Sequence, residues 1–208
     1  MAKHPRLSPV PELAVRTRRA YFDCKFGQLH VRTAFPTTGG FDEQVTLVCL
    51  HSREGSSRSF ARFLPEIAAD RSVYAPDLPG FGESDAAPSL SPADAARAVG
   101  DLVTDLRLRK IDLVGVRFGA AVALDLASAR PELVRRLVLV GPPPMERIAS
   151  INQQCLILKV KSDRADEPRW SLSALPNARV VELTDHAGDL FDADPQGLAR
   201  QIGGFLGG

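Results

Sequence analysis

The chain has 208 residues, a net charge of +1 and 44% hydrophobic residues, which is typical of one soluble globular domain. A net charge this close to zero gives no electrostatic support for a nucleic-acid or membrane partner. No apolar run approaches the roughly 18 residues of a membrane helix, and the basic start of the chain lacks the apolar core of a signal peptide.

The cysteines indicate a reducing compartment. Cys24, Cys49 and Cys155 are far apart and lie in strand-like segments. An odd count without metal-ligand spacing predicts reduced, mostly buried thiols in a cytoplasmic protein. The proline-containing segment 1–18 is expected to be a loosely ordered N-terminal arm, and residues 19–208 a single domain.

Along the chain, short apolar segments alternate with helical patterns. A hairpin that turns at Phe26-Gly27 is predicted from residues 21–25 and 29–35. Apolar, β-branched segments predict further buried strands at residues 45–50, 72–75, 111–114, 137–140, 155–158 and 178–183.

Helices are predicted between these strands. One follows a cap at Ser56 or Ser57, because apolar residues recur at helical spacing from residue 60 to residue 67. Ser91-Pro92 opens the second, residues 118–130 form an almost wholly apolar third, and Asp194-Pro195 opens the last. This alternation predicts an α/β fold with a mostly parallel sheet of about eight strands, an N-terminal antiparallel hairpin and helices on both faces. Ligands of such folds bind beyond the carboxyl ends of the strands.

Five loops follow those strand ends. They are His51-Ser-Arg-Glu-Gly-Ser-Ser, Pro76-Asp-Leu-Pro-Gly-Phe-Gly-Glu-Ser84, Gly115-Val-Arg-Phe-Gly119, the loop with Asp163, and Asp189-Leu-Phe-Asp-Ala-Asp-Pro195. Together they resemble the α/β-hydrolase superfamily over about Tyr21 to Leu206. The resemblance implies that residues 115–119 form the nucleophile elbow G-x-S-x-G, that Asp163 is the acid of the catalytic triad and that the first loop supplies an oxyanion-hole amide.

The chain departs from this family at two catalytic positions. Arg117 stands where the elbow carries serine, and a guanidinium is always protonated and is not a nucleophile. Gly115 and Gly119 are retained, so we expect the turn itself to be intact. Gly188 stands at the position of the catalytic histidine, counted back from Pro195, and His186 lies two residues before it. Only Asp163 remains of the triad.

The lid is a third departure. Members of this family commonly insert one after the strand that here ends at Val140, but only thirteen residues separate Gly141 from Cys155. We therefore expect no cap domain and an open cleft, or a cleft covered by the second subunit of a homodimer. Water in an uncovered site weakens the electrostatic stabilisation that serine catalysis needs.

Three roles for Arg117 remain open. It pairs with Asp163 in the space of the missing side chains, it anchors an anionic ligand together with the amides of Phe118 and Ser52, or it extends into solvent. His51 lines the same site, although holding its own loop is the simpler role for it. His186 is a candidate for a displaced base, and a solvated loop residue is the simpler interpretation.

Other polar residues carry less information about function. Asp77 and Ser84 are expected to shape their loop through turn hydrogen bonds, with Gly80 and Gly82 permitting its path. Cys49 and Cys155 are expected to be buried and inert. The remaining acidic pairs, residues 166–167 and residues 192 and 194, lack metal-ligand neighbours, so we expect no metal and no cofactor.

We therefore favour a non-hydrolytic α/β-hydrolase-like protein that binds a small molecule or a partner chain at the former active site. In one interpretation the small molecule is anionic. The first alternative is an esterase- or lactonase-like hydrolase with a displaced apparatus based on His186 or His51. The second is an isomerase or cyclase in which Arg117 polarises a carbonyl or holds a carboxylate.

Overall fold

The computed structural model describes residues 15–37, 44–88, 90–141, 148, 151–160, 177–183 and 190–208. Their strands form an eight-stranded sheet in the order β1-β2-β4-β3-β5-β6-β7-β8. Antiparallel pairing joins β1 to β2 and β2 to β4, and every other neighbouring pair is parallel. The strands are β1 (Thr17–Cys24), β2 (Gly27–Ala34), β3 (Thr46–Leu50), β4 (Val73–Pro76), β5 (Ile111–Val116), β6 (Val134–Val140), β7 (Gln154–Val160) and β8 (Ala178–Leu183).

The antiparallel hairpin extends further than the sequence pattern suggested. Strand β1 begins at Thr17, so Thr17 and Arg18 pair with β2 instead of belonging to the N-terminal arm. The turn between the strands falls at Lys25-Phe26, and Gly27 is the first residue of β2. Gly27 has φ 106°, and a Cβ there would lie 2.5 Å from Oδ2 of Asp85, so a side chain would be strained and crowded.

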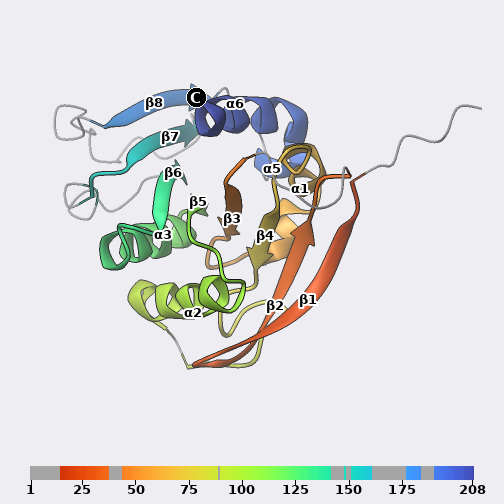
Figure 1. Ribbon diagram of the computed structural model, residues 1–208, viewed down its shortest axis with the longest axis vertical. Helices are drawn as coiled ribbons and strands as arrows, with labels where there is room; N and C mark the ends of the chain where they lie inside the picture. Colours follow the sequence, from red (N-terminus) through yellow and green to blue (C-terminus); the bar gives the residue numbers. More distant parts are fainter. Residues whose placement is uncertain are drawn as a thin grey trace, which may run out of the picture.

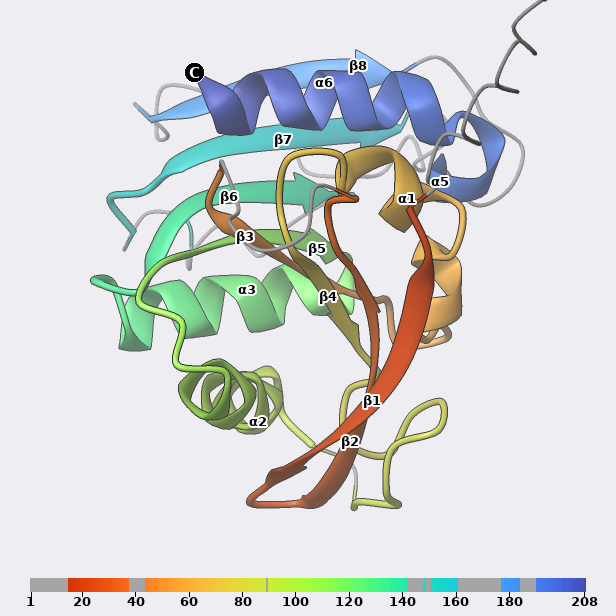
Figure 2. The same cartoon turned by 45° about the vertical axis from the view of Figure 1, so that its right-hand side comes forward.

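Helices cover both faces of the sheet, as Figures 1 and 2 show. Helices α2 (Pro92–Asp105) and α3 (Phe118–Ala129) pack on one face, and α1 (Phe63–Ile67), α5 (Leu190–Ala193) and α6 (Pro195–Gly207) on the other. Alternate residues of the central strands divide between the two layers: Val48 packs on the α2–α3 side, and Leu47 and Cys49 pack on the α1–α6 side. The strands are therefore apolar on both faces, as the sequence predicted.

Two helices begin where the sequence placed their caps. Ser91 accepts a hydrogen bond from the Asp94 N–H, and the Asp94 side chain accepts one from the Ser91 N–H, which completes a capping box. Asp194 caps α6 by accepting from the Gly197 N–H at 2.9 Å. In both helices proline occupies the first turn, where its missing N–H has no intrahelical partner.

The single helix predicted after Ser56 is instead two short pieces. Ser56 caps a 3₁₀ turn, η1 (Ser57–Phe60), and α1 starts only at Phe63. Pro65 explains the break, because proline lacks the N–H that would reach back to residue 61 and is tolerated only in the first turn of an α-helix. Apolar periodicity located the buried face correctly but did not detect this interruption.

The connection after β6 is short. It comprises residues 141–153, of which the structure describes Gly141, Ile148 and residues 151–153, and no cap domain is evident. Among the helices of the described residues, none combines the length and apolarity needed to cross a bilayer.

Phe191 links α5 to η1 and α1 and provides a test of this packing. Its ring is 2% exposed and meets Phe60 and Phe63 edge to face at centroid distances of 4.8 and 5.0 Å. We expect Phe191→Ala to lower the free energy of unfolding by about 3–5 kcal/mol, since it leaves a cavity beside the rings of Phe60 and Phe63. Urea denaturation measures this. Phe35→Ala, at a residue 36% exposed, is the control and should cost clearly less; equal losses would contradict the packing described.

Candidate functional site

Arg117 occupies a sharp turn between β5 and α3. Its backbone has φ 48° and ψ −101°, and Arg107 is the only other non-glycine residue with positive φ in the described part of the chain. Such a conformation costs about 1–3 kcal/mol and persists only where surrounding contacts enforce it. Here the Arg117 N–H donates to the Val140 carbonyl at 2.9 Å, and the Arg117 carbonyl accepts from the Ala120 N–H at 3.1 Å. The elbow predicted from the sequence is therefore present, with arginine at its tip.

Two glycines make this turn sterically feasible. A Cβ on Gly119 would overlap the carbonyl group of Leu50, and a Cβ on Gly115 would lie 2.5 Å from the Gly119 carbonyl oxygen. The start of α3 is thus pressed against the end of β3. This contact brings Arg117 and Phe118 next to the loop that begins with His51.

The Arg117 side chain is exposed, and its stem passes over Gly141 at the end of β6. A Cβ on Gly141 would lie 3.2 Å from Cγ of Arg117, and Gly141 has φ 83°. The Gly141 N–H in turn donates to the Leu158 carbonyl of β7 at 3.1 Å. The stem of Arg117 therefore lies on the β6–β7 side of the elbow.

His51 holds two loops together. Its Nδ1–H donates to the Ser52 carbonyl at 2.7 Å, and its Nε2 accepts from the Leu78 N–H at 2.9 Å. The ring is fully buried, and burial lowers its pKa despite the Ser52 hydrogen bond and the charge of Asp77. Both nitrogens of a neutral ring are engaged, so neither is available to take a proton from a substrate or a serine.

Asp77 organises the loop that follows β4. Its buried carboxylate accepts hydrogen bonds from the N–H groups of Ser57 and Glu83 and from Nδ1 of His30. The Ser84 hydroxyl donates to the Asp77 carbonyl at 2.6 Å. Gly82, at φ 58°, lies so close that a Cβ would overlap the Asp77 carboxylate. The turn hydrogen bonds expected of Asp77 and Ser84 are therefore present.

Opposing effects set the pKa of Asp77. Burial is the largest single effect and raises the pKa, but the hydrogen bonds to Glu83, Ser57 and His30 together outweigh it and hold the pKa below its usual range. His30, which had no recognisable role in the sequence, adds a hydrogen bond of 2.9 Å to the same carboxylate. Its position between two buried apolar residues of a strand was the available signal for an inward-facing polar partner.

Arg53 is a second cation beside the elbow, and the sequence did not single it out. Its guanidinium lies over the Phe118 ring, with Cζ 4.2 Å from the ring centroid. Phe81 extends this aromatic group, at centroid distances of 6.3 Å from Phe118 and 5.6 Å from His51. Only the fold brings residues 53, 81 and 118 together. Arg53 and Arg117 are both exposed, so the mouth of the elbow carries two cations.

Several predicted site residues lie outside the described residues, namely Asp163, His186 and Gly188. Their relation to Arg117 therefore stays a prediction. Cys49 and Cys155 are buried, and burial raises the pKa of Cys49 far above its usual range and that of Cys155 to about 12, so neither is a reactive thiolate. No group of three or more His, Cys, Asp or Glu side chains suited to a metal occurs among the residues that the structure describes.

The elbow, the Asp77 loop and the sheet order together match one known fold. The model of the family described as alpha/beta hydrolase fold matches residues 45–179. This chain belongs to that family. Among solved structures, a predicted CIB-like hydrolase from Thermoplasma acidophilum aligns with a TM-score of 0.77 and 16% identity over 92% of this chain and 98% of that one. Naproxen esterase from Bacillus subtilis aligns equally well, over 92% of both chains.

Several proteins with similar sequences are named as hydrolases, and others as a synthase or an acetyltransferase. The chain is 45% identical over 86 residues to 2-hydroxymuconate semialdehyde hydrolase of Pseudomonas sp. (strain CF600), covering 38% of this chain and 28% of that protein. It is 35% identical over 167 residues to pyrrolizixenacetamide deacetylase of Xenorhabdus hominickii, covering 75% of this chain and 63% of that protein. The chain thus spans less than two thirds of the length of these relatives.

The packing of the elbow on β3 predicts that Gly119→Ala is severe. Its Cβ meets backbone atoms that cannot move independently, so we expect a loss of about 3 kcal/mol or more in unfolding free energy, or failure to fold. Gly100→Ala in α2 is the matched control, because its Cβ would meet only Cδ1 of Leu126, at 3.9 Å. Chemical denaturation of both variants decides, and equal tolerance would show that α3 is not pressed onto β3.

Asp77 predicts a defined dependence of stability on pH. Because its folded pKa is depressed, its contribution is present above the unfolded value of about 3.9 and is lost as the pH falls through the folded pKa. Asp77→Asn should cost about 1–3 kcal/mol at pH 7. The gap between the two proteins should narrow in urea titrations below about pH 4. A gap that widens on acidification would contradict this assignment.

Proposed function

We propose that this α/β-hydrolase family member does not hydrolyse substrates and instead binds a small anionic molecule at the former nucleophile elbow. The observation that carries the proposal is Arg117, held at the tip of the elbow with φ 48° and ψ −101°. A guanidinium can neither attack a carbonyl nor form an acyl-enzyme, but it binds carboxylate or phosphate through two parallel hydrogen bonds. In this proposal the strained turn that exposes the nucleophile in the family is retained, and it exposes the Arg117 guanidinium, which binds an anion.

The surroundings of Arg117 support an anionic ligand. Helix α3 starts at the next residue, and its first N–H groups point toward the elbow without intrahelical acceptors. Arg53 adds a guanidinium held over Phe118. We infer that the ligand carboxylate or phosphate lies between Arg53, Arg117 and the amides of Ser52 and Phe118.

Loss of the catalytic triad is part of the same proposal. By resemblance, Gly188 replaces the catalytic histidine, and Asp163 keeps the acid position. The stem of Arg117 passes over Gly141 on the β6–β7 side of the elbow, and β7 ends three residues before Asp163 in the sequence. An Arg117–Asp163 ion pair in the absence of ligand is compatible with this direction and would offset the cost of a cation at a helix N-terminus, about 0.3–1 kcal/mol.

A hydrolase with a displaced apparatus is the second candidate, because relatives with similar sequences include a named hydrolase and a deacetylase. The hydrogen bonds of His51 argue against it as the base, since Ser52 and Leu78 occupy both ring nitrogens. His186 is the remaining histidine for that role. An isomerase or cyclase that uses Arg117 is a third candidate, and a homodimer that covers the cleft is compatible with each of them.

Two measurements on the intact chain test the proposal. Fluorophosphonate should label no serine, and benzoate and inorganic phosphate should bind saturably, as followed by NMR. Arg117→Ala should weaken benzoate binding about tenfold, since it removes a charge-assisted hydrogen-bonding group. Arg107→Ala is the matched control, because Arg107 is also an exposed arginine with positive φ but lies after α2.

The outcomes separate the candidates. Rapid serine labelling, or hydrolysis of short p-nitrophenyl esters that is lost on His186→Ala, would favour the displaced hydrolase. Turnover of a substrate that Arg117→Ala abolishes would favour the isomerase or cyclase. Benzoate affinity that responds equally to Arg107→Ala and Arg117→Ala would remove the elbow from the binding site.

A further inference from the structure

Arg53 is held in place by an aromatic ring and not by a carboxylate. Its Cζ lies 4.2 Å from the centroid of the Phe118 ring, and the residue is exposed. Among the residues that the structure describes, no carboxylate pairs with Arg53, although Glu54 is next to it in the chain. The charge of Arg53 is therefore accessible to a ligand, while its position is already restricted before a ligand binds.

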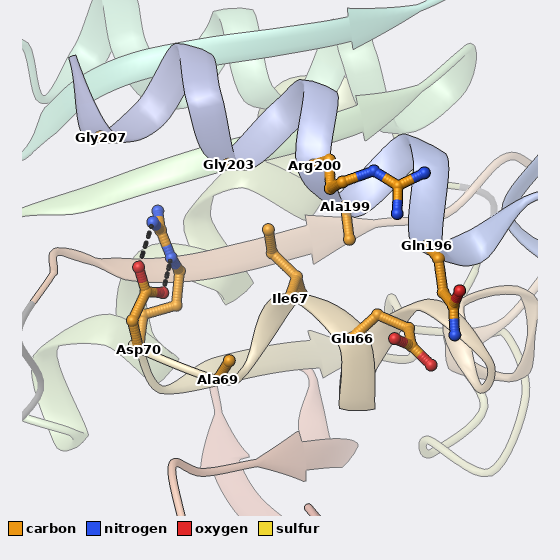
Figure 3. Close-up of a pocket in the computed structure, with 10 residues that line it drawn as sticks. Glu66, Ile67, Ala69, Asp70, Gln196, Ala199, Arg200, Gly203 and Gly207 are labelled. Carbon is orange, nitrogen blue, oxygen red and sulfur yellow. Dashed lines mark hydrogen bonds and ion pairs between the residues drawn. The ribbon is translucent and has the colours of Figure 1, made fainter.

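Other arginines of the chain differ from Arg53 in this respect. Arg58 pairs with Glu83 at 3.0 Å. Immediately before β4, beside the hollow between α1 and α6 in Figure 3, Asp70 accepts from Nε and Nη2 of Arg71 at 2.8 and 3.2 Å. Nη1 of Arg71 has no hydrogen-bond partner among the described residues, but this side chain is only 1% exposed, so no ligand reaches it. Arg53, in contrast, is both accessible and without an anionic partner in the described part of the chain.

Arg53 and Arg117 flank the elbow from opposite sides. Strand β5 ends at the elbow and lies between β3 and β6 in the sheet. Arg53 comes three residues after the end of β3, whereas the stem of Arg117 passes over Gly141, directly after β6. Neighbouring strands lie about 5 Å apart, so the ends of β3 and β6 are separated by about 10 Å. The two side chains therefore start from well-separated supports.

The aromatic group keeps Arg53 on its own side of the elbow. The Phe118 ring packs on the core beneath α2 and α3 and lies 6.3 Å from the Phe81 ring, centroid to centroid. Phe81 belongs to the loop after β4, and β4 lies next to β3 on the side away from β5. The cation–π contact thus holds the Arg53 guanidinium toward the β3–β4 side, away from the side over which the stem of Arg117 passes.

We propose that the elbow binds a small ligand with two separated anionic groups, one held by Arg117 and the other by Arg53. The proposal rests on the function proposed above and specifies the class of ligand. A guanidinium binds one carboxylate through two parallel hydrogen bonds. A ligand with a single carboxylate leaves one of the two guanidinium groups without an anion, whereas a dicarboxylate with a short rigid spacer satisfies both.

Terephthalate is a suitable probe, because a rigid ring separates its two carboxylates. Monomethyl terephthalate is the matched control ligand, with the same ring and one charge fewer. In NMR titrations of the full ¹⁵N-labelled chain, terephthalate should bind about tenfold more tightly than the monomethyl ester, since it forms a second charge-assisted pair. Phthalate, whose carboxylates are adjacent, should gain clearly less, because it does not reach both sides of the elbow.

Arg53→Gln tests the second anion site. The ratio of the two affinities should fall to about two, which is the statistical advantage of carrying two equivalent carboxylates. Arg58→Gln is the matched control variant: it removes the same charge close by in the chain, but Arg58 is paired with Glu83, so the ratio should stay at about ten. Thermal unfolding checks that both variants remain folded.

The outcomes separate this proposal from the one for the elbow. Benzoate binding that Arg117→Ala weakens, together with similar affinities for terephthalate and its monomethyl ester, would overturn the second anion site and leave the first standing. Equal weakening of both ligands by Arg53→Gln, or equal affinity for phthalate and terephthalate, would also overturn it, because both cations would then meet one group. Absence of saturable benzoate binding would remove both proposals. Preference for terephthalate that is lost in Arg53→Gln and kept in Arg58→Gln supports it.

Discussion

The close contact between the start of α3 and the end of β3 determines the geometry of the elbow. Gly119 has no room for a Cβ beside the Leu50 carbonyl, and Gly115 has none beside the Gly119 carbonyl. With both backbones this close, the residue between β5 and α3 must adopt positive φ and project outward from the sheet. The same contact brings the loop containing His51 and Arg53 next to Phe118. The geometry of the elbow thus depends on backbone packing and does not require a serine.

Buried polar groups fix the loops around this contact. His51 joins the loop after β3 to the one after β4, and the Asp77 carboxylate gathers N–H groups from Ser57 and Glu83. Each is removed from water, so a lost partner would leave a buried donor or acceptor unsatisfied. These hydrogen bonds therefore hold a rigid frame in which arginine can stand at the nucleophile position without disturbing its neighbours.

The two ends of the parallel strands carry different charged side chains. At the carboxyl ends of the parallel strands, the described residues place the guanidinium groups of Arg53 and Arg117 beside the elbow, and we propose that they bind an anion. At the amino ends of these strands, the buried Arg71 side chain is paired with Asp70. Helix α6 extends between these two ends of the sheet, beginning at the Asp194 cap and ending with Gly207.

The sequence by itself determined the fold class, the parallel strands, the caps at Ser91 and Asp194 and the residue at the tip of the elbow. These follow from periodicity, capping chemistry and the spacing of glycines, which are local properties of the chain. It did not reveal the break before α1, because Pro65 acts through a missing hydrogen bond that apolar periodicity does not record. Only the tertiary structure placed Arg53 over Phe118 and left Nη1 of Arg71 without an acceptor among the described residues. Both depend on packing between segments distant in the chain, where neither pattern nor propensity specifies which side chains meet.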